Sequence, residues 1–459
     1  MLDLVPNADG LVLTFIETGA RAERQHSRTL ATAQARLAAV VNAVADVVIR
    51  ERRLTLYART FSYTHEEYRN IAGAIALFQH PDIRLMMKET PHDFFLTHPN
   101  DEFTGTIARP TIVEFDTGAE FNGQGLIANT WPEHILTRAR DLLRRPHVRG
   151  YVARTDRYGD TRIIGRPSEI NLLALDRFTQ DPQVTAETIY DDFITARYGC
   201  AALPEVKAAF KNAFDIVTSA LYTLGTNTAD HSSLNYDPYG SSYARHVSGK
   251  WLDPPIVFVH HDVNREFHYW KDVIDHLAPA WAKTARGAQL DEVPWVTKEG
   301  WLRPGEQMTL AFVEDVRREK QYGVRLAEAS VKAIERAKPS LDPRAYEDLH
   351  HYFTRTWLTA RLHAAVATAY FGFRLYARGE AFRTPASTQA VRDALADIPE
   401  IARLIKTYPV KPAAGQWNWV EDADAALKYH GQITQTGWPA VTRGVPNPHA
   451  GKTFPMISR

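Results

Sequence analysis

The chain has 459 residues and a mass of 51.8 kDa, enough for one large domain with one or two smaller ones. Its 54 basic and 54 acidic side chains give a formal charge of zero, so no positive excess indicates a nucleic-acid partner or an anionic membrane surface. The single cysteine, Cys200, excludes an intrachain disulfide and a cysteine-cluster metal site.

The N-terminal segment does not show the pattern of a secretory signal, which is a basic segment leading into an apolar one. We therefore expect a cytoplasmic protein. Apolar runs are also too short to cross a membrane, as the run from Ile256 to Val259 illustrates, so we expect no membrane partner.

The first 155 residues alternate between short apolar runs and longer segments with apolar residues at helical spacing. Strand, helix, strand with short links is typical of a parallel sheet. Five such units indicate part of an α/β fold, the (β/α)8 TIM-type barrel, which normally needs about 250 residues and here is incomplete at its N-terminus. The expected strands cover 9–16, 54–61, 83–87, 111–115 and 148–154, and the expected helices cover 29–50, 65–79 and 132–145.

From about residue 171 the pattern becomes helical, with Thr185 as the N-cap of one helix. We divide the chain into a portion of the barrel, 1–165, and a mainly helical C-terminal region, 166–459, through which we expect a homodimer if one forms. The tail from 408 to 459 is rich in Trp and Pro and is expected to be irregular. Further helices are expected at 204–222, 305–337, 343–378 and 388–407.

The stretch from 110 to 125 is the most informative one for function. An expected strand ends there among three acids, Glu114, Asp116 and Glu120, and several glycines. The carboxyl ends of barrel strands converge, and active sites of barrel enzymes lie at that end. Taken alone, the stretch could equally be a solvated acidic loop.

Charged residues follow the neighbouring strands as well: Glu17, then Arg59, then Lys88 with Asp93. Two or three carboxylates suit glycoside hydrolysis, in which one carboxylic acid protonates the leaving oxygen and another carboxylate activates water. Fixed cations suit the carboxylate of an acidic sugar. The alternative is a layer of ordinary ion pairs, such as Lys88 with Glu89 or Arg59 with Asp93.

Several segments resemble the α-glucuronidases of glycoside hydrolase family 67. The resemblance runs from about residue 9 to 225, in the family's order and with nearly equal spacings. Lys-Glu-Thr-Pro-His-Asp-Phe-Phe at 88–95 resembles Lys-Asn-Gly-Pro-x-Asp-Phe-Gln, and Val-Glu-Phe-Asp-Thr-Gly-Ala-Glu-Phe-Asn-Gly-Gln at 113–124 resembles (Met/Leu)-Glu-Leu-Gln-Ile-Thr-Gln-Glu-Tyr-Leu-Gly-Gln. Shorter similarities lie at 9–19, where the family's strand carries the general acid, at 58–63 and at 171–182.

The resemblance implies an inverting exo-glycosidase that removes a terminal α-linked (4-O-methyl) glucuronic acid from xylan-derived oligosaccharides, without cofactor or metal. It makes Glu17 the general acid, lets Asp93 and Glu120 share the role of general base, and assigns Arg59 and Lys88 to the uronate carboxylate. For inversion, Glu17 should lie about 6.5–9.5 Å from the base carboxylate.

The sequence also departs from the family. Thr90 stands where the family has Gly, and Asp116 where it has Gln, so the sugar or linkage can differ. The family's general acid follows the fourth barrel strand, whereas the matching strand here begins at residue 9. A longer protein, a second chain or the C-terminal helices would then complete the sheet. The alternatives are a related uronidase or glycosidase, and a non-catalytic carbohydrate-binding remnant of such a barrel.

Two pairs of adjacent histidines, His260-His261 followed by Asp262 and His350-His351, suggest a metal site at first sight. Adjacent residues point to different sides of a regular element, so one metal ion could not take both. Surface or core roles are therefore favoured for these histidines.

Overall fold

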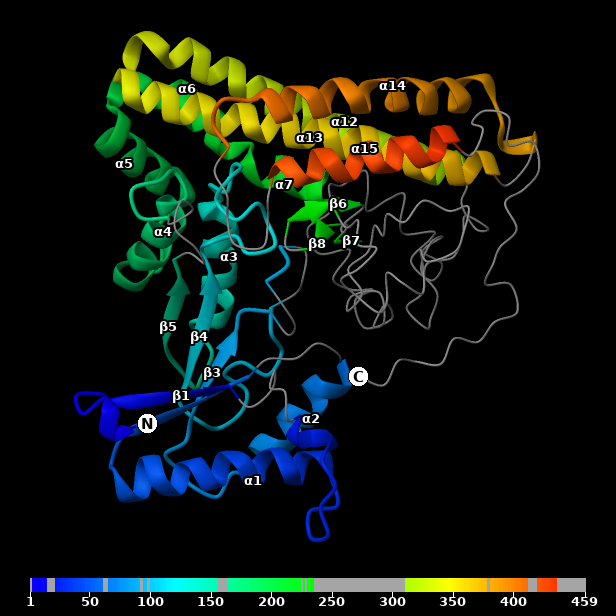
Figure 1. Ribbon diagram of the computed structural model, residues 1–459. Helices are drawn as coiled ribbons and strands as arrows, with labels where there is room; N and C mark the ends of the chain where they lie inside the picture. The colour runs from blue at the N-terminus through cyan, green and yellow to red at the C-terminus, as the bar shows by residue number, and fades with distance from the viewer. Residues whose placement is uncertain are drawn as a thin grey trace.

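The computed structural model describes residues 2–14, 21–60, 65–90, 94–96, 100–155, 163–223, 226–227, 229–230, 232–234, 310–377, 380–411 and 419–435. Its centre is a five-stranded, wholly parallel sheet whose strands pair in chain order, and Figure 1 shows β3, β4 and β5 side by side. The strands are β1 (Gly10–Thr14), β2 (Thr55–Arg59), β3 (Arg84–Lys88), β4 (Thr111–Asp116) and β5 (Val148–Arg154).

Strictly sequential order has a consequence for the helices. Every crossover moves one strand further in the same direction, and parallel crossovers are right-handed, so the helices between strands lie on one face of the sheet. The helices between the strands are α1 (Ala33–Ala45), followed by a π-helical stretch Asp46–Glu51, then α2 (His65–Ile75) and α3 (Pro132–Leu142).

The α/β class, the parallel sheet and the helical C-terminal region predicted from the sequence are confirmed, while a closed eight-stranded barrel stays a prediction.

The alternation of side chains along the strands separates a core face from a second face. Leu56, Ala58, Leu85 and Met87 are buried against α1 and α2 in one hydrophobic cluster. Val113 and Phe115 are buried against α3 in a second, larger cluster. The residues between them on β2, β3 and β4 therefore point to the opposite face of the sheet.

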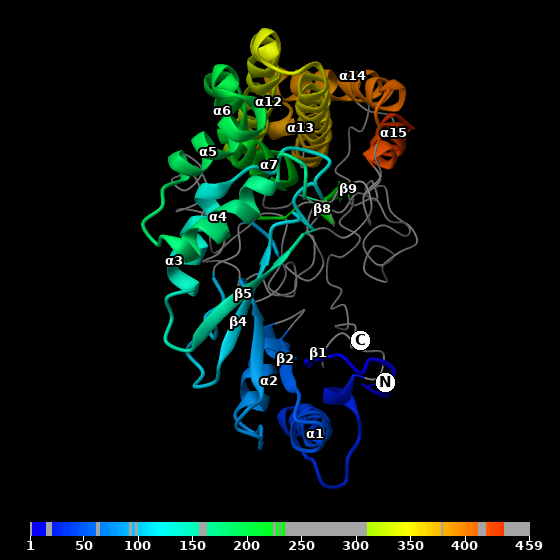
Figure 2. The same ribbon diagram turned by 90° about the vertical axis from the view of Figure 1, so that its left-hand side faces the viewer.

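The C-terminal part of the described chain is helical. In Figure 1 the long helices lie above the sheet, beyond the ends toward which the arrows of β3, β4 and β5 point, and Figure 2 views α12 and α13 nearly end-on. The helices are α4 (Glu169–Gln180), α5 (Ala186–Tyr198), α6 (Leu203–Lys211), α7 (Ala213–Leu221), α12 (Leu310–Ala337), α13 (Pro343–Ala377), α14 (Pro385–Thr407) and α15 (Trp419–Gln435). Two short hairpins join this region: β6 (Tyr222–Thr223) with β7 (Thr226–Asn227), and β8 (Ala229–Asp230) with β9 (Ser233–Leu234).

Three sequence expectations about helices can be compared directly with the structure. Thr185 caps α5 as predicted, since its side chain accepts a hydrogen bond from the N–H of Thr188. The single helix expected over 204–222 is two helices that meet at Asn212. The prediction of an irregular tail is wrong over 419–435, because Trp419 and Tyr429 are buried at helical spacing on α15, with Ala423, Ala426 and Ile433 on the same side.

A long loop joins the sheet to the helical region. After β4, residues 117–131 are almost entirely buried, and side chains of distant helices bind their backbone. The N–H of Ala128 donates to Thr356 Oγ1 at 2.9 Å, and the N–H of Asn129 donates to the Tyr352 hydroxyl at 2.8 Å. The larger hydrophobic cluster continues from β4 through α3 into α13 and α15. The carboxyl ends of the strands thus face the helical region. The division of the chain into two regions at residue 165 stays a prediction.

Candidate active site

The face of the sheet opposite α1, α2 and α3 is charged at the carboxyl ends of the strands. Arg59 ends β2, Lys88 ends β3, and Glu114 lies near the end of β4. In the parallel register Lys88 lies beside Glu114, and Asp116 lies beside Arg154 at the end of β5. We call Arg59, Lys88, Glu114, Glu120 and Arg154 the strand-end layer.

Arg59 and Glu114 form the best-defined ion pair of this layer. Arg59 Nε donates to Glu114 Oε2 at 2.7 Å, and Arg59 Nη2 donates to Glu114 Oε1 at 3.0 Å. The two side chains are 17% and 6% exposed, so this two-bond pair is shielded from water. Glu114 thus fixes the guanidinium of Arg59.

Lys88 and Arg154 lie over the ring of Phe94, and Arg154 also pairs with Glu120. Arg154 pairs with a carboxylate oxygen of Glu120, whose side chain is 4% exposed. Lys88 Nζ lies 4.4 Å from the Phe94 ring centroid, and Arg154 Cζ lies 5.3 Å from it, both within cation–π range. Phe94 and Arg154 therefore link Lys88 with Glu120 at the strand ends. Arg154 was not predicted, although its position as the last residue of the fifth strand could have indicated it.

Asp116 organises the loop that carries Glu120. One carboxylate oxygen of Asp116 accepts the N–H of Gly118 at 3.1 Å, and the other accepts the N–H of Glu120 at 2.7 Å. Such short-range bonds are typical of an Asp that shapes a turn. Ala119 at the centre of this turn has a positive φ of 58°. Asp116 therefore acts on the site by positioning Glu120.

Glu89 is a buried carboxyl group that sequence reasoning considered only as a partner of Lys88. It follows Lys88 directly and packs against Arg138 of α3, whose Nε lies 3.7 Å from Glu89 Oε2. The N–H of Asp116 donates to Glu89 Oε1 at 3.0 Å, and Oε2 accepts no hydrogen bond from the described residues. Burial raises the pKa of Glu89 to about 7, against the lowering effect of Arg138.

Two of the predicted catalytic residues, Glu17 and Asp93, lie outside the described residues. The distance between acid and base and the sharing of the base role by Asp93 and Glu120 therefore stay predictions. The roles assigned to Glu120, Arg59 and Lys88 also stay predictions, although their positions at the strand ends are now known.

The histidine pair on α13 has two separate partners. His350 Nε2 lies 3.6 Å from Glu335 Oε1, while His351 Nδ1 lies 2.7 Å from the Tyr408 hydroxyl oxygen. The second pair, His260-His261 with Asp262, lies outside the described residues. Among the residues that the structure describes, no three His, Cys, Asp or Glu side chains form a group able to hold a metal ion. No helix in that same part of the chain combines the length and apolar character needed to cross a membrane.

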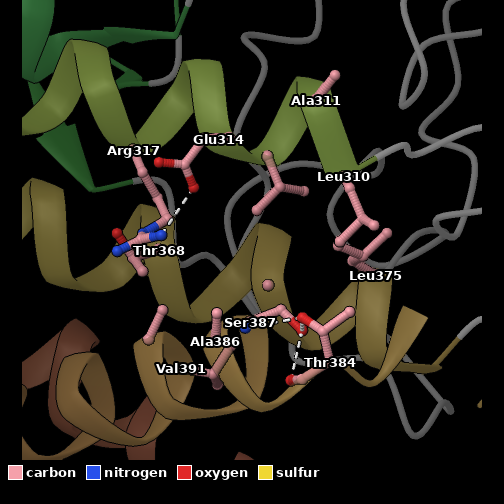
Figure 3. A pocket seen from close by; sticks show the side chains of 13 residues that line it. Leu310, Ala311, Glu314, Arg317, Thr368, Leu375, Thr384, Ala386, Ser387 and Val391 are labelled. Atoms are coloured by element: carbon pink, nitrogen blue, oxygen red, sulfur yellow. Dashed lines mark hydrogen bonds and ion pairs between the residues drawn. The ribbon is translucent and has the colours of Figure 1, made fainter.

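One cavity lies far from this chemistry, within the helical region. It has a volume of about 310 Å³ and lies between α12, α13 and α14 (Figure 3). Its lining is mostly apolar, with Leu310 and Leu375 on one side, and includes the ion pair of Arg317 with Glu314 at 2.7 Å. None of the residues of the strand-end layer lines it.

Comparison with known proteins adds little to this geometry. A scan against protein-family models finds no match, and a search of curated proteins finds none either. Among solved structures, the chain is similar to a GH138 enzyme targeting pectin rhamnogalacturonan II, with a TM-score of 0.43 and 9% sequence identity. The match covers 90% of this chain and 53% of that one, so the chain spans about half the length of that enzyme. A likeness this distant does not by itself indicate an activity.

Proposed function

We propose that this protein is an inverting exo-glycosidase that removes a terminal uronic acid from an oligosaccharide. The observation that carries the proposal is that Lys88 and Arg154 lie over the ring of Phe94 at the carboxyl ends of parallel strands, with Glu120 paired to Arg154. This end of a parallel sheet is where barrel enzymes hold their substrates. The reaction needs two carboxyl groups, of which Glu120 would supply the base, and the cations suit the carboxylate of an acidic sugar.

The cations of the layer divide into two kinds. Arg59 is held by two hydrogen bonds to Glu114, so its guanidinium is fixed in place. Lys88 is a compact charge on a flexible stem, and its neighbour on β4 is Glu114. We assign Lys88 to direct contact with the uronate carboxylate, with Arg59 as the fixed cation beside it. Arg154 is a third cation near the proposed substrate position, and it is held there by its ion pair with Glu120.

The carboxylates take the acid and base roles. Glu120 is paired with Arg154, and a nearby cation favours the ionised form that a general base needs. Asp116 holds the backbone of Glu120, which fixes the direction from which a water molecule would be activated. Asp93 would share this role, and Glu17 would protonate the leaving oxygen.

The identity of the sugar and its linkage are proposed from the resemblance to the α-glucuronidases described above. An α-linked glucuronic acid, with or without a 4-O-methyl group, on a xylan-derived oligosaccharide would fit the motifs at 88–95 and 113–124. We further propose that the five-stranded sheet is part of a (β/α)8 barrel, because its sequential strand order and one-sided crossovers are those of a barrel. Thr90 and Asp116, which depart from the family, make another uronide the nearest alternative substrate.

The test compares an acidic substrate with its neutral counterpart. Wild type should hydrolyse an aldouronic oligosaccharide and leave the corresponding glucoside intact. Lys88→Met should lower kcat/KM for the uronide about tenfold to a hundredfold, as expected for the loss of a charged hydrogen bond. Glu400→Gln, at an exposed position on α14, should leave kcat/KM unchanged. Equal turnover of both substrates would contradict the assignment of the cations.

A second candidate is a non-catalytic carbohydrate-binding protein. It is favoured by the sheet itself, since within the described residues β1 and β5 each pair with one strand only. Calorimetry would then show binding of the uronic oligosaccharide by wild type, with no product detectable after prolonged incubation.

A further inference from the structure

A second cavity, of about 370 Å³, lies away from the strand-end layer. It is formed where the loops that follow β4 and β5 meet α5 and α13. We call it the Arg355 pocket; the lining residues used below are Leu126, Arg166, Arg197, Asp348 and Arg355. None of them has a role in the function proposed above.

Arg355 is a buried cation in this pocket. Only 7% of the residue is exposed, and its Nε donates to the carbonyl oxygen of Leu126 at 2.9 Å. Within the described chain, its two terminal nitrogens donate no hydrogen bond and meet no carboxylate in an ion pair. Burying a guanidinium that no carboxylate contacts directly is costly, and this burial lowers the pKa of Arg355 to about 10. An anion entering the cavity would offset that cost.

The rest of the lining is also positive. Arg166 is exposed and makes no ion pair with any residue that the structure describes. Arg197 is engaged by Glu169, with Nη1 3.1 Å from the carboxylate oxygen. Asp348 is the one acid that lines the pocket, against three arginines. Arg355 and Arg166 together thus present two guanidinium groups to the same cavity.

We propose that the Arg355 pocket binds a small ligand through an oxyanion group, a carboxylate or a phosphate. The guanidinium of Arg355 offers parallel N–H donors whose spacing matches two oxygens of either group. Arg166, at the exposed edge, adds a second charge that draws the anion in. The carbonyl oxygen of Leu126 holds Arg355 in place, and Arg166 lies on the described segment between β5 and α4.

The experiment is isothermal titration calorimetry on the full chain with three probes: glucuronate, inorganic phosphate and glucose. The expected result is saturable binding of glucuronate or phosphate by wild type and none of glucose. Arg355→Gln should weaken binding about tenfold or more, since it removes a charged, two-bond contact. Arg166→Gln, at an exposed position, should fold normally and weaken binding severalfold. Arg361→Gln is the matched control, because Arg361 lies on the same helix but does not line this pocket.

The outcomes separate this site from the strand-end layer. Glucuronate that binds more tightly than phosphate would identify a carboxylate ligand, and the reverse order would identify a phosphate ligand. Glucuronate binding that is lost in Lys88→Met but kept in Arg355→Gln and Arg166→Gln would place the ligand at the strand ends and overturn the proposal. Absence of saturable binding of both anions by wild type, or equal binding of glucose, would overturn it too. The inference does not rest on the proposed glycosidase activity.

Discussion

Glu89 should make the protein less stable as the pH rises from about 4.5 to about 7. The carboxyl has an ordinary pKa of 4.5 in the unfolded chain, and burial raises its pKa to about 7 in the folded protein. Between these values the folded state holds a proton that the unfolded state has released. The free energy of unfolding therefore falls with rising pH in this window and is fully retained below it.

The size of the effect follows from the same two values. Each pH unit between 4.5 and about 7 corresponds to about 1.4 kcal/mol, so the loss is about 3 kcal/mol. The side chain is 5% exposed, so solvent screening should reduce this figure little. Glu89→Gln should abolish this loss, because a glutamine keeps an acceptor for the N–H of Asp116 and cannot titrate.

The assay is chemical denaturation of wild type and Glu89→Gln at several pH values between 4 and 8. The stability of wild type relative to the variant should fall by about 3 kcal/mol across the window. Glu51→Gln is the control, because it removes a carboxyl group from the surface. A difference between wild type and Glu89→Gln that stays constant with pH would refute the assignment of a buried, protonated Glu89.

Three further predictions concern the loop, a helix cap and the base. Gly123→Ala should lower the free energy of unfolding by about 1–3 kcal/mol more than Gly165→Ala. Both glycines have a positive φ, but of the two only Gly123 would bring a Cβ against a neighbour, the side chain of Ile127. Equal losses in denaturation would contradict that packing. Thr185→Ala should cost about 1 kcal/mol through loss of the α5 cap, whereas Thr195→Ala, exposed within the same helix, should cost less; the reverse order would argue against the cap. Glu120→Gln should lower kcat on a uronide by about a hundredfold or more, measured on folded protein, and an unaltered kcat would remove Glu120 from the reaction.

Local patterns in the sequence predicted the sheet, because each parallel strand is marked by its own short run of apolar residues. The short apolar runs at β1 to β5 and the short links between them were enough to place five parallel strands and the charged residues at their ends. The N-cap at Thr185 could also be predicted, because it depends only on residues of the same helix.

The choice of partners could not be predicted, because it depends on contacts between distant elements. Arg59 on β2 reaches Glu114 on β4, across the strand that lies between them. Glu89 was misjudged because its burial depends on Arg138, nearly fifty residues further along the chain. The α15 helix was not predicted, because the Trp and Pro content of the tail indicates irregular structure, whereas the helical spacing of Trp419 and Tyr429 indicates a helix.

The most direct test of the proposed function is the stereochemistry of the product released from an aldouronic oligosaccharide, followed by NMR. An inverting enzyme acting on an α-linked uronic acid releases the β-anomer first, and the account predicts this product from wild type and none from Glu17→Gln or Glu120→Gln. Initial release of the α-anomer would contradict inversion, and no release from any uronoside would contradict the glycosidase assignment itself.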